Sequence, residues 1–243
     1  MNHETPTIAV LLCAGLGTRL KNFTDGPKAM VDIAGYPLLH YQLRQLKRCG
    51  IHDAWINLHH RSEAIVKHFG DGRDWGVRIR YWPERQLRGT AGALSPMRRE
   101  LKSTFLVVYG DVLHRLDYRR FLAAHRMRRV TATLGVYRVP DPWNCGVIDI
   151  GRDGKIQGFV EKPQTQTRAS PWVNSGVYAL EPEVLRWVPS RRPVDFGRDV
   201  FPQMLSAGES LSAYRVRSTM IDVGIPEKYR AAQTLAAQGA WQP

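Results

Sequence analysis

The sequence lacks the features that define several classes of protein. None of its apolar runs approaches the roughly 18 residues of a membrane-spanning helix, so we expect no membrane-embedded part. Cysteine is scarce: Cys13, Cys49 and Cys145 are far apart and odd in number, and they predict neither a disulfide framework nor a metal site. The first residues, MNHETPT, lack the basic and apolar regions of a signal peptide, which predicts a cytoplasmic protein.

Acidic residues are also few. The 22 Asp and Glu residues face 35 Lys and Arg residues, for a net charge of +13. Such a surplus attracts nucleic acid, but it also concentrates small anionic substrates. The arginine pairs in MRRE, DYRRF, RMRRV and SRRP have no interleaved aromatic residues and match no helix-turn-helix, zinc-finger or RNA-binding signature. We therefore interpret the charge as solvated surface and expect no nucleic-acid partner; the alternative, a nucleic-acid-binding protein, would show salt-dependent retention on DNA or RNA.

What the sequence does contain is an alternation of apolar strands and amphipathic helices. Residues 7–15 and 103–111 are continuous apolar runs of strand length, typical of central parallel strands. Residues 37–50 predict a helix, and residues 62–70 predict a shorter one capped by Ser62. Beyond residue 130 strands dominate, and Asp153-Gly154 predicts a hairpin.

This order predicts an α/β fold: a doubly wound, Rossmann-like mixed sheet with helices on both faces. We expect a single domain over residues 1–243, with a nucleotide-binding half of about 1–130 and a strand-rich half of about 131–243. No hexapeptide repeat follows the last predicted helix, so no appended β-helix is expected.

The glycine turn in LLCAGLGTRL, residues 11–20, follows the first predicted strand. A P-loop would need Lys-Ser or Lys-Thr where this chain has Thr18-Arg19, and a dinucleotide fingerprint would need glycine where it has Leu20. What remains is a turn whose backbone N–H groups can cradle phosphate oxygens. Arg19 and Lys28 would then be two cations beside one polyphosphate, which suits phosphoryl or nucleotidyl transfer.

LCAGLGTRL followed by PKAMV resembles the signature of the sugar-1-phosphate nucleotidyltransferases. The resemblance continues in order through PERQLRGTAGAL, VVYGDV, CGVIDI, FVEKP, NSGVYAL and IDVGIPEKY, and its pattern is closest to guanylyltransferases acting on heptose or mannose 1-phosphate. It implies an enzyme that condenses a nucleoside triphosphate with a hexose or heptose 1-phosphate and releases pyrophosphate. Uridylyl or other nucleotidyl transfer and a non-catalytic regulatory homologue are alternatives. A glycosyltransferase, a further alternative, would need an Asp-x-Asp motif at YGDV, and the single carboxylate there counts against it.

The resemblance also implies roles for individual residues. Asp111 and Asp222 end predicted strands and would hold Mg²⁺, which prefers oxygen ligands, while Arg19 and Lys28 would contact the phosphates during catalysis. Nucleotide binding is implied for Leu12, Ala14, Gly15, Gly17, Thr18, Arg19, Glu84, Gly89, Thr90 and Asp111. Binding of the sugar phosphate is implied for Gly146, Glu161, Lys162, Asn174 and Ser175, which would make residues from about 131 onward the sugar-binding half.

Glu84 suggests which base is preferred. An ionised carboxylate only accepts hydrogen bonds, and the adjacent N1–H and N2–H₂ donors of guanine match it, whereas uracil, thymine and adenine match it poorly. We therefore expect GTP to be favoured. The chain departs from the family pattern at Cys13 and Ala29, and its loop KNFTDG is about one residue short. The sequence leaves homo-oligomerisation open.

Overall fold

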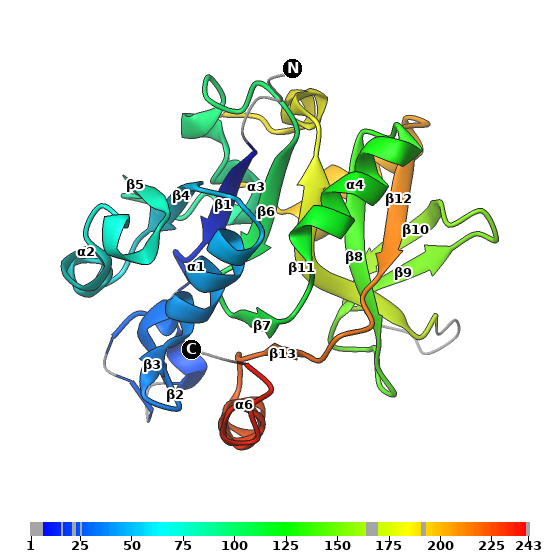
Figure 1. Ribbon diagram of the computed structural model, residues 1–243. Helices are drawn as coiled ribbons and strands as arrows, with labels where there is room; N and C mark the ends of the chain where they lie inside the picture. Colours follow the sequence, from blue (N-terminus) through cyan, green and yellow to red (C-terminus); the bar gives the residue numbers. More distant parts are fainter. Residues whose placement is uncertain are drawn as a thin grey trace. The chain divides into compact units, whose positions relative to one another are not determined.

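The computed structural model (Figure 1) describes residues 7–15, 17–20, 23–24, 26–163, 170–190 and 193–241. Residues 21, 22 and 25 of the loop KNFTDG lie outside the described residues. The chain divides into two compact units. Unit 1 contains Met1–Leu87, Val108–Tyr118 and Ser218–Pro243, and unit 2 contains Arg88–Val107 and Arg119–Arg217. The functional division into a nucleotide half and a sugar-phosphate half stays a prediction.

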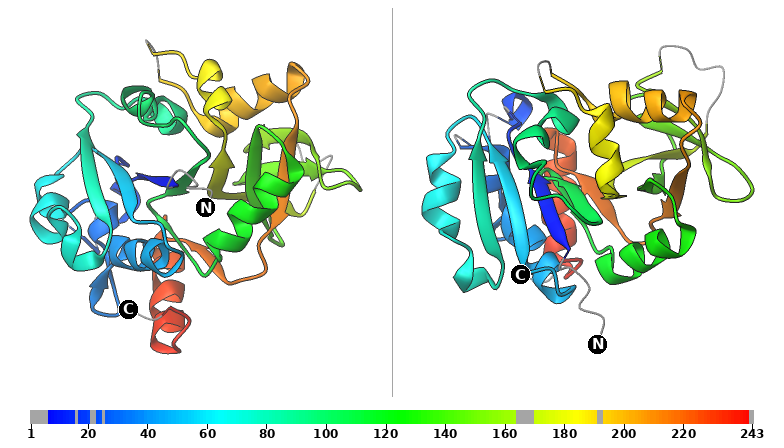
Figure 2. Two further views of the ribbon diagram at one scale, coloured as in Figure 1. Left: turned by 45° about the horizontal axis from the view of Figure 1, so that its top comes forward. Right: turned by 90° about the horizontal axis from the view of Figure 1, so that it is seen from above.

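Unit 1 contains a parallel sheet. β1 (Ile8–Leu12) pairs with β4 (Asp53–Leu58), and β4 pairs in the same direction with β5 (Arg78–Pro83). The three strands run side by side from blue to teal in Figures 1 and 2, and the end of β6 (Phe105–Tyr109) neighbours β1. The apolar runs around β1 and β6 therefore form the strands that the sequence predicted.

The helices of unit 1 are α1 (Leu38–Arg48), α2 (Glu63–Phe69) and α6 (Pro226–Ala237). α1 ends at Arg48, with Cys49 as its C-cap, and Gly50 follows with φ of 74°. The Ser62 cap was wrong: Ser62 itself adopts helical dihedral angles and its side chain makes no capping hydrogen bond.

Two short ribbons complete unit 1. β2 (Asp32–Ile33) pairs with β3 (Tyr36–Pro37), and β7 (Val112–His114) pairs antiparallel with β13 (Met220–Asp222). In Figure 1 the β7–β13 ribbon lies above α6.

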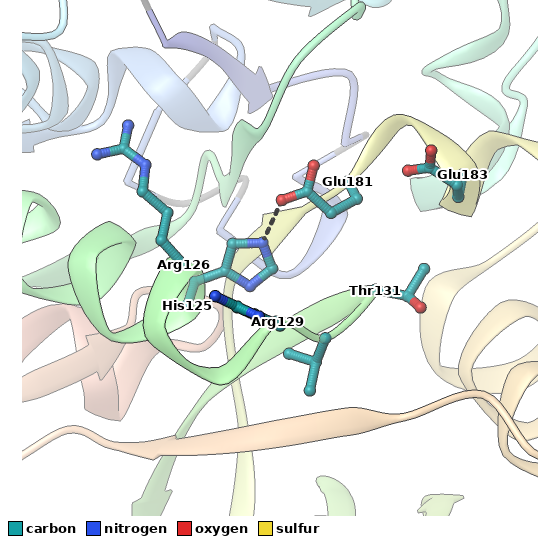
Figure 3. Close-up of a pocket in the computed structure, with 7 residues that line it drawn as sticks. His125, Arg126, Arg129, Thr131, Glu181 and Glu183 are labelled. Carbon is teal, nitrogen blue, oxygen red and sulfur yellow. Dashed lines mark hydrogen bonds and ion pairs between the residues drawn. The ribbon is translucent and has the colours of Figure 1, made fainter. Parts of the chain in front are cut away.

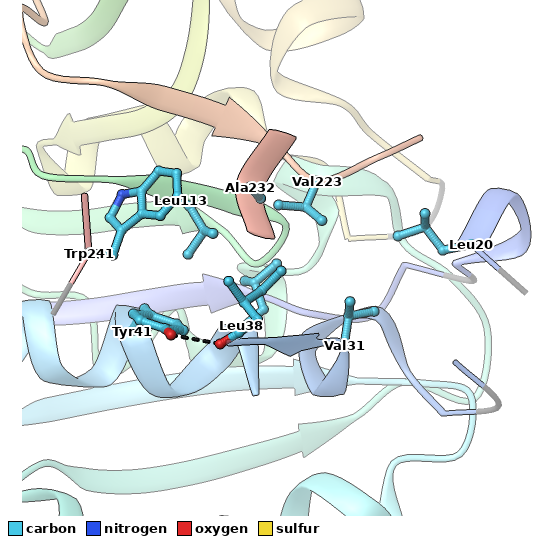
Figure 4. Packing of buried hydrophobic residues seen from close by; sticks show 9 residues of the cluster. Leu20, Val31, Leu38, Tyr41, Leu113, Val223, Ala232 and Trp241 are labelled. Carbon is cyan, nitrogen blue, oxygen red and sulfur yellow. Dashed lines mark hydrogen bonds between the residues drawn. The ribbon is translucent and has the colours of Figure 1, made fainter. Parts of the chain in front are cut away.

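A hydrophobic cluster holds these segments together (Figure 4). It contains Leu20, Val31, Ile33, Leu38, Tyr41, Leu113, Val223, Ala232 and Trp241, all buried. The Tyr41 hydroxyl donates to the Ile33 carbonyl at 2.7 Å, which satisfies its polar end within the cluster. Each fully buried Leu or Val contributes about 1.5–3 kcal/mol relative to an exposed one. The cluster therefore fixes the glycine loop, α1, β7 and α6 in one frame.

Unit 2 is built on five further strands, β8 (Ala132–Arg138), β9 (Gly146–Ile150), β10 (Ile156–Glu161), β11 (Trp172–Leu180) and β12 (Leu211–Arg215). β8 pairs antiparallel with β11 and parallel with β12, so the sheet is mixed. β9 and β10 form the antiparallel hairpin predicted at Asp153-Gly154, where Gly154 has φ of 80°.

Helices of unit 2 are α3 (Gly89–Gly92), α4 (Tyr118–Arg128) and α5 (Phe201–Ser206), preceded by a π-helical turn over Phe196–Val200. α3 is short, and a 3-10 turn at Ser95–Met97, which carries Pro96, follows it. Tyr178 of β11 packs its ring against Phe196 of the π-helical turn and Phe201 of α5, with ring centroids 5.0–5.3 Å apart.

The parallel and antiparallel strands, covered by helices, confirm the predicted α/β class with a mixed sheet. Within the described part of the chain, no helix has both the length and the apolar character needed to cross a lipid bilayer.

Candidate active site

The glycine loop begins where β1 ends. Cys13 and Ala14 are buried, and Gly15 is exposed. Gly17 has φ of 63°, a conformation that favours glycine, and a Cβ there would contact the Cβ of Lys28 at 3.5 Å. The chain then enters a 3-10 helix, Thr18–Leu20, in which Leu20 is fully buried and the neighbouring Arg19 is exposed. The buried leucine thus anchors the loop and leaves the guanidinium accessible.

Three predicted residues meet at one point of unit 1. The Lys28 side chain, only 11% exposed, places Nζ 2.6 Å from Asp111 Oδ2 and 3.8 Å from Asp222 Oδ1. Because two carboxylates converge on a single ammonium group, removal of either leaves Lys28 with one partner. The structure therefore brings together a lysine and two aspartates from three distant segments of the sequence.

The β7–β13 ribbon positions both aspartates. Asp222 lies opposite Val112, and the Val223 N–H donates to the Asp111 carbonyl at 2.8 Å. The Gly110 N–H donates to the Leu12 carbonyl at 2.8 Å, so the turn that carries Asp111 is tied to the start of the glycine loop. Both carboxylates and the glycine loop therefore share one hydrogen-bonded frame.

The hydrophobic cluster of unit 1 anchors the same residues. Leu20 follows Arg19, Val31 ends the turn that begins at Lys28, Leu113 is two residues after Asp111, and Val223 follows Asp222. The buried neighbours of these charged residues therefore belong to one hydrophobic cluster (Figure 4), and replacement of a charged residue leaves that cluster intact.

Asp222 lies in surroundings that favour a bound cation. Burial, followed by the nearby Asp111 carboxylate, raises the pKa of Asp222 above its ordinary value, while Lys28, Lys228 and Arg19 oppose that rise. Asp222 Oδ1 is buried and has no hydrogen-bond partner among the described residues, since its distance to Lys28 Nζ is 3.8 Å. An unpartnered buried carboxylate oxygen beside a second carboxylate is a donor set that fits a divalent ion with oxygen preference.

Glu84 follows β5 and is buried, with only 5% of its surface exposed. Its Oε1 accepts a hydrogen bond from Asn57 Nδ2 at 2.9 Å, and Asn57 Oδ1 in turn accepts the Cys13 N–H at 2.7 Å. The Glu84 carbonyl is 2.8 Å from His59 Nδ1. The Asn57 amide thus connects the Glu84 carboxylate to the Cys13 N–H at the beginning of the glycine loop.

In unit 2, Glu161 ends β10 opposite Gly146 on β9. A Cβ on Gly146 would lie 2.7 Å from Glu161 Oε2, and one on Gly197 would lie 2.6 Å from the same oxygen. Burial raises the pKa of Glu161, and the nearby Lys162 and Arg198 oppose the rise. The carboxylate therefore lies against two glycines, in a space that a side chain at either would fill.

The other predicted residues of unit 2 lie on β11 and α3. Asn174 donates to the Tyr178 hydroxyl at 2.7 Å, and Ser175 is buried with its hydroxyl accepting the Val177 N–H at 3.3 Å. Gly89 and Thr90 open α3, and Asp195 Oδ1 accepts both the N–H and the hydroxyl of Thr90 at 3.1 Å. Thr90 is thus held within unit 2.

The predicted residues divide between the units. Unit 1 contains Leu12, Ala14, Gly15, Gly17, Thr18, Arg19, Lys28, Glu84, Asp111 and Asp222. Unit 2 contains Gly89, Thr90, Gly146, Glu161, Lys162, Asn174 and Ser175. All four residues expected to be catalytic therefore belong to unit 1.

One open cavity of unit 2, about 400 Å³ in volume, contains none of the predicted residues. It is lined by His125, Arg126, Arg129, Val130, Thr131, Glu181 and Glu183 (Figure 3). His125 Nε2 lies 2.9 Å from Glu181 Oε1, and Nδ1 lies 2.8 Å from Thr133 Oγ1. Because both ring nitrogens are engaged, His125 joins α4 to β8 and to the end of β11.

Sequence reasoning missed two polar residues of unit 1, Asn57 and Gln42. Asn57 lies on β4 and connects Glu84 to Cys13. Gln42 lies on the buried face of α1 and donates to the Tyr109 and Val112 carbonyls on either side of Asp111. A signal was present in each case, because an amide side chain interrupts an otherwise apolar strand or helix face.

Comparisons with known proteins show the family to which the chain belongs. A family model described as nucleotidyl transferase matches residues 8–239. UTP–glucose-1-phosphate uridylyltransferase of Synechocystis sp. is 32% identical over 239 residues, covering 92% of this chain and 62% of that protein. Mannose-1-phosphate guanylyltransferase of Mycobacterium tuberculosis is 33% identical over 224 residues, covering 91% and 62%. The chain therefore spans less than two thirds of the length of these two relatives.

A solved structure is similar over nearly its whole length. The crystal structure of HddC from Yersinia pseudotuberculosis complexed with GMP-PN has a TM-score of 0.79 at 28% identity, covering 94% of this chain and 98% of that one. Both sequence relatives are named as sugar-1-phosphate nucleotidyltransferases, so the resemblance seen in the sequence blocks is confirmed. With a family model matched over residues 8–239, this chain belongs to the nucleotidyl transferase family.

Proposed function

We propose that this protein transfers a nucleotidyl group from a nucleoside triphosphate to a sugar 1-phosphate, giving a nucleoside-diphosphate sugar and pyrophosphate. The observation that carries the proposal is the convergence of Asp111 and Asp222 on Lys28 Nζ, at 2.6 and 3.8 Å, in the unit that also contains the glycine loop. A phosphate-cradling loop beside cations and paired carboxylates suits transfer at phosphorus.

In this reaction an oxygen of the sugar phosphate forms a bond to the α-phosphorus. The bond from that phosphorus to the bridging oxygen breaks, and pyrophosphate leaves with its electron pair. Two anions must approach each other, so the protein must offset their repulsion. We assign this task to Lys28 at the reacting phosphate and to Arg19, whose exposed guanidinium can bind two phosphate oxygens at once. The backbone N–H groups of Gly15 and Gly17 would bind the remaining oxygens.

Asp111 and Asp222 would hold the divalent metal, which we propose to be Mg²⁺. Their oxygens, including the unpartnered Oδ1 of Asp222, fit a hard cation that usually binds one or two carboxylates together with substrate phosphates. When bound, such an ion supplies positive charge to phosphate oxygens. Asp111 and Asp222 would orient it through the β7–β13 ribbon that fixes their backbones.

We further propose that GTP is the favoured nucleotide. Glu84 offers a carboxylate that only accepts hydrogen bonds, and guanine has two adjacent donors. Asn57 would orient the carboxylate through its hydrogen bond to Oε1. The M. tuberculosis relative is a guanylyltransferase and the Yersinia structure contains GMP-PN, which supports guanine. The Synechocystis relative is a uridylyltransferase, which makes UTP the principal alternative.

The sugar phosphate would bind residues of unit 2. Glu161 would accept hydrogen bonds from sugar hydroxyls, and Lys162 would hold the phosphate as a point charge. Gly146 leaves the Glu161 carboxylate room, and Asn174 and Ser175 belong to the same predicted set. A cytoplasmic location and the absence of a nucleic-acid partner stay predictions.

The test is a matrix of ATP, GTP, UTP, CTP and dTTP against several hexose and heptose 1-phosphates, scored by metal-dependent release of pyrophosphate. We expect release only when both substrates are present, with the highest kcat/KM for GTP. Release that needs no sugar phosphate would contradict the proposal, because it would be hydrolysis. Higher kcat/KM with UTP, dTTP or ATP would overturn the base assignment alone.

A further inference from the structure

Gln42 occupies an unusual place on α1. The helix directs Leu39, Leu43 and Leu46 into the interior, and Gln42 is buried on the same side with only 3% of its surface exposed. A buried amide costs free energy unless its polar atoms are hydrogen-bonded, so its contacts need an explanation.

The amide nitrogen of Gln42 binds two carbonyl groups. Nε2 donates to the Tyr109 carbonyl at 2.8 Å and to the Val112 carbonyl at 3.0 Å. These two residues flank Gly110 and Asp111, since Tyr109 ends β6 and Val112 begins β7. An NH₂ group has two hydrogens, so one side chain can bind both ends of the turn that carries Asp111.

The other half of the amide indicates that packing alone does not explain Gln42. Its Oε1 atom is buried and has no hydrogen-bond partner among the described residues. Leaving an acceptor unsatisfied costs about 1–3 kcal/mol, which an apolar side chain of the same size would avoid. The two hydrogen bonds from Nε2 are therefore the feature that distinguishes glutamine from methionine or leucine at this position.

We propose that Gln42 is a positioning residue that fixes the Asp111 carboxylate for metal binding. The proposal rests on the proposed function, in which Asp111 is a metal ligand. Two backbone hydrogen bonds hold the Asp111 turn: the Val223 N–H donates to the Asp111 carbonyl, and the Gly110 N–H donates to the Leu12 carbonyl. Gln42 adds the two contacts from α1. Hydrogen-bonding partners behind a metal ligand typically affect metal affinity by about 10- to 100-fold.

Gln45 offers a matched control on the same helix. Its Nε2 donates to the Leu116 carbonyl at 2.7 Å, five residues beyond Asp111 and after β7 has ended. Gln45→Met therefore removes one amide-to-carbonyl hydrogen bond from α1 without touching the Asp111 turn. Any general weakening of α1 would appear in both variants.

The experiment compares Gln42→Met, Gln45→Met and Asp111→Asn with the unmodified protein. Mn²⁺ binding is measured without substrates by the electron paramagnetic resonance signal of free Mn²⁺, and the free energy of unfolding is measured by urea titration. Kinetics with the best substrate pair then give kcat and the half-saturating metal concentration. We expect Gln42→Met to raise the Mn²⁺ dissociation constant and the half-saturating concentration by about 10-fold or more, with excess metal restoring much of kcat. Gln45→Met should leave both within about twofold, since it spares the Asp111 turn.

Unchanged Mn²⁺ binding in folded Gln42→Met, with binding lost in Asp111→Asn, would overturn the positioning role alone. Unchanged binding in Asp111→Asn would instead overturn the metal site of the proposed function. If Gln42→Met does not fold, Gln42→Asn decides, because it retains the amide but shortens it by one methylene. Weaker Mn²⁺ binding in Gln42→Asn would support the role, and unchanged binding would overturn it.

Discussion

Lys28 Nζ lies 2.6 Å from Asp111 Oδ2, so the cation expected to bind phosphate is paired with a carboxylate expected to bind the metal. The side chain of Lys28 is 11% exposed, and that of Asp111 is 32% exposed. In such surroundings the pair holds both groups in a defined place, and loss of Asp111 would leave Lys28 with Asp222 at 3.8 Å. The pairing also means that Lys28 and a divalent cation would compete for the same oxygens.

Lys28→Met should therefore separate metal binding from catalysis. We expect turnover to fall by about 100-fold or more, as for other charge donors aimed at a reacting centre. The affinity for Mn²⁺ should stay the same or increase, because removal of a cation 2.6 Å from Asp111 ends its repulsion of the metal. Mn²⁺ titration and steady-state kinetics on one preparation measure both effects. Weaker Mn²⁺ binding would show that Lys28 positions the carboxylates rather than competing with the metal.

Glu84→Gln should reduce the preference for GTP over UTP. The amide replaces one acceptor with a donor, so it no longer matches two adjacent donors of guanine. A bidentate contact is worth about 1–3 kcal/mol against the wrong base, which is roughly 5- to 150-fold in specificity. The ratio of kcat/KM values for GTP and UTP measures the change. An unchanged ratio in a folded variant would show that other groups recognise the base.

Gly146→Ala should weaken binding of the sugar phosphate. The added Cβ would lie 2.7 Å from Glu161 Oε2 and 2.9 Å from Cζ of the Phe159 ring, so the carboxylate and the ring must both shift. We expect KM for the sugar 1-phosphate to rise by about 10-fold, the loss of one hydrogen bond to a charged group, while KM for the nucleotide stays near its original value. Glu161→Gln provides the comparison. Equal rises in both KM values would contradict a role confined to the sugar.

His114 predicts a stability that depends on pH. Its Nδ1 accepts the Leu116 N–H at 3.2 Å, and burial lowers the pKa of His114 to about 4. The folded protein therefore keeps this ring neutral at pH values where the unfolded chain binds a proton. The contribution of neutral His114 to the free energy of unfolding is fully present above about pH 6.5 and is lost as the pH falls toward 4. At pH 5 the loss from this one residue is about 2 kcal/mol.

His114→Gln removes that titration. Urea unfolding at pH 7 and pH 5 should show a smaller loss of stability in the variant than in the unmodified protein. The buried His40, whose pKa is lowered to about 4, chiefly by burial, remains in both proteins and keeps part of the slope. An identical pH dependence in both proteins would contradict the assignment to His114.

The parts of the fold that the sequence predicts correctly are those set by the local pattern of a short segment. The runs that form β1 and β6, the hairpin at Gly154 and the helix α1 follow from local periodicity and turn residues. A local signal failed at the start of α2, because the Ser62 side chain does not cap the helix although its residue type favours that role.

The candidate site was predictable where family blocks contain charged residues, and less so where amides support them. Asn57 binds Cys13 across 44 residues, and Gln42 binds Tyr109 across 67 residues. No local pattern specifies which carbonyl or N–H a buried amide will find, since this depends on how distant segments pack. Such supporting residues therefore require the structure.

Nucleotidyl transfer to a sugar 1-phosphate is tested most directly by following the α-phosphorus of the nucleotide. The protein is incubated with GTP labelled at the α-phosphate, the sugar 1-phosphate that performs best in the matrix, and Mg²⁺. We predict that the label appears in a nucleoside-diphosphate sugar of the expected mass, in amounts equal to the pyrophosphate released, and that Asp222→Asn abolishes most of it. Label recovered as free nucleotide, or product formed equally by Asp222→Asn, would contradict this account.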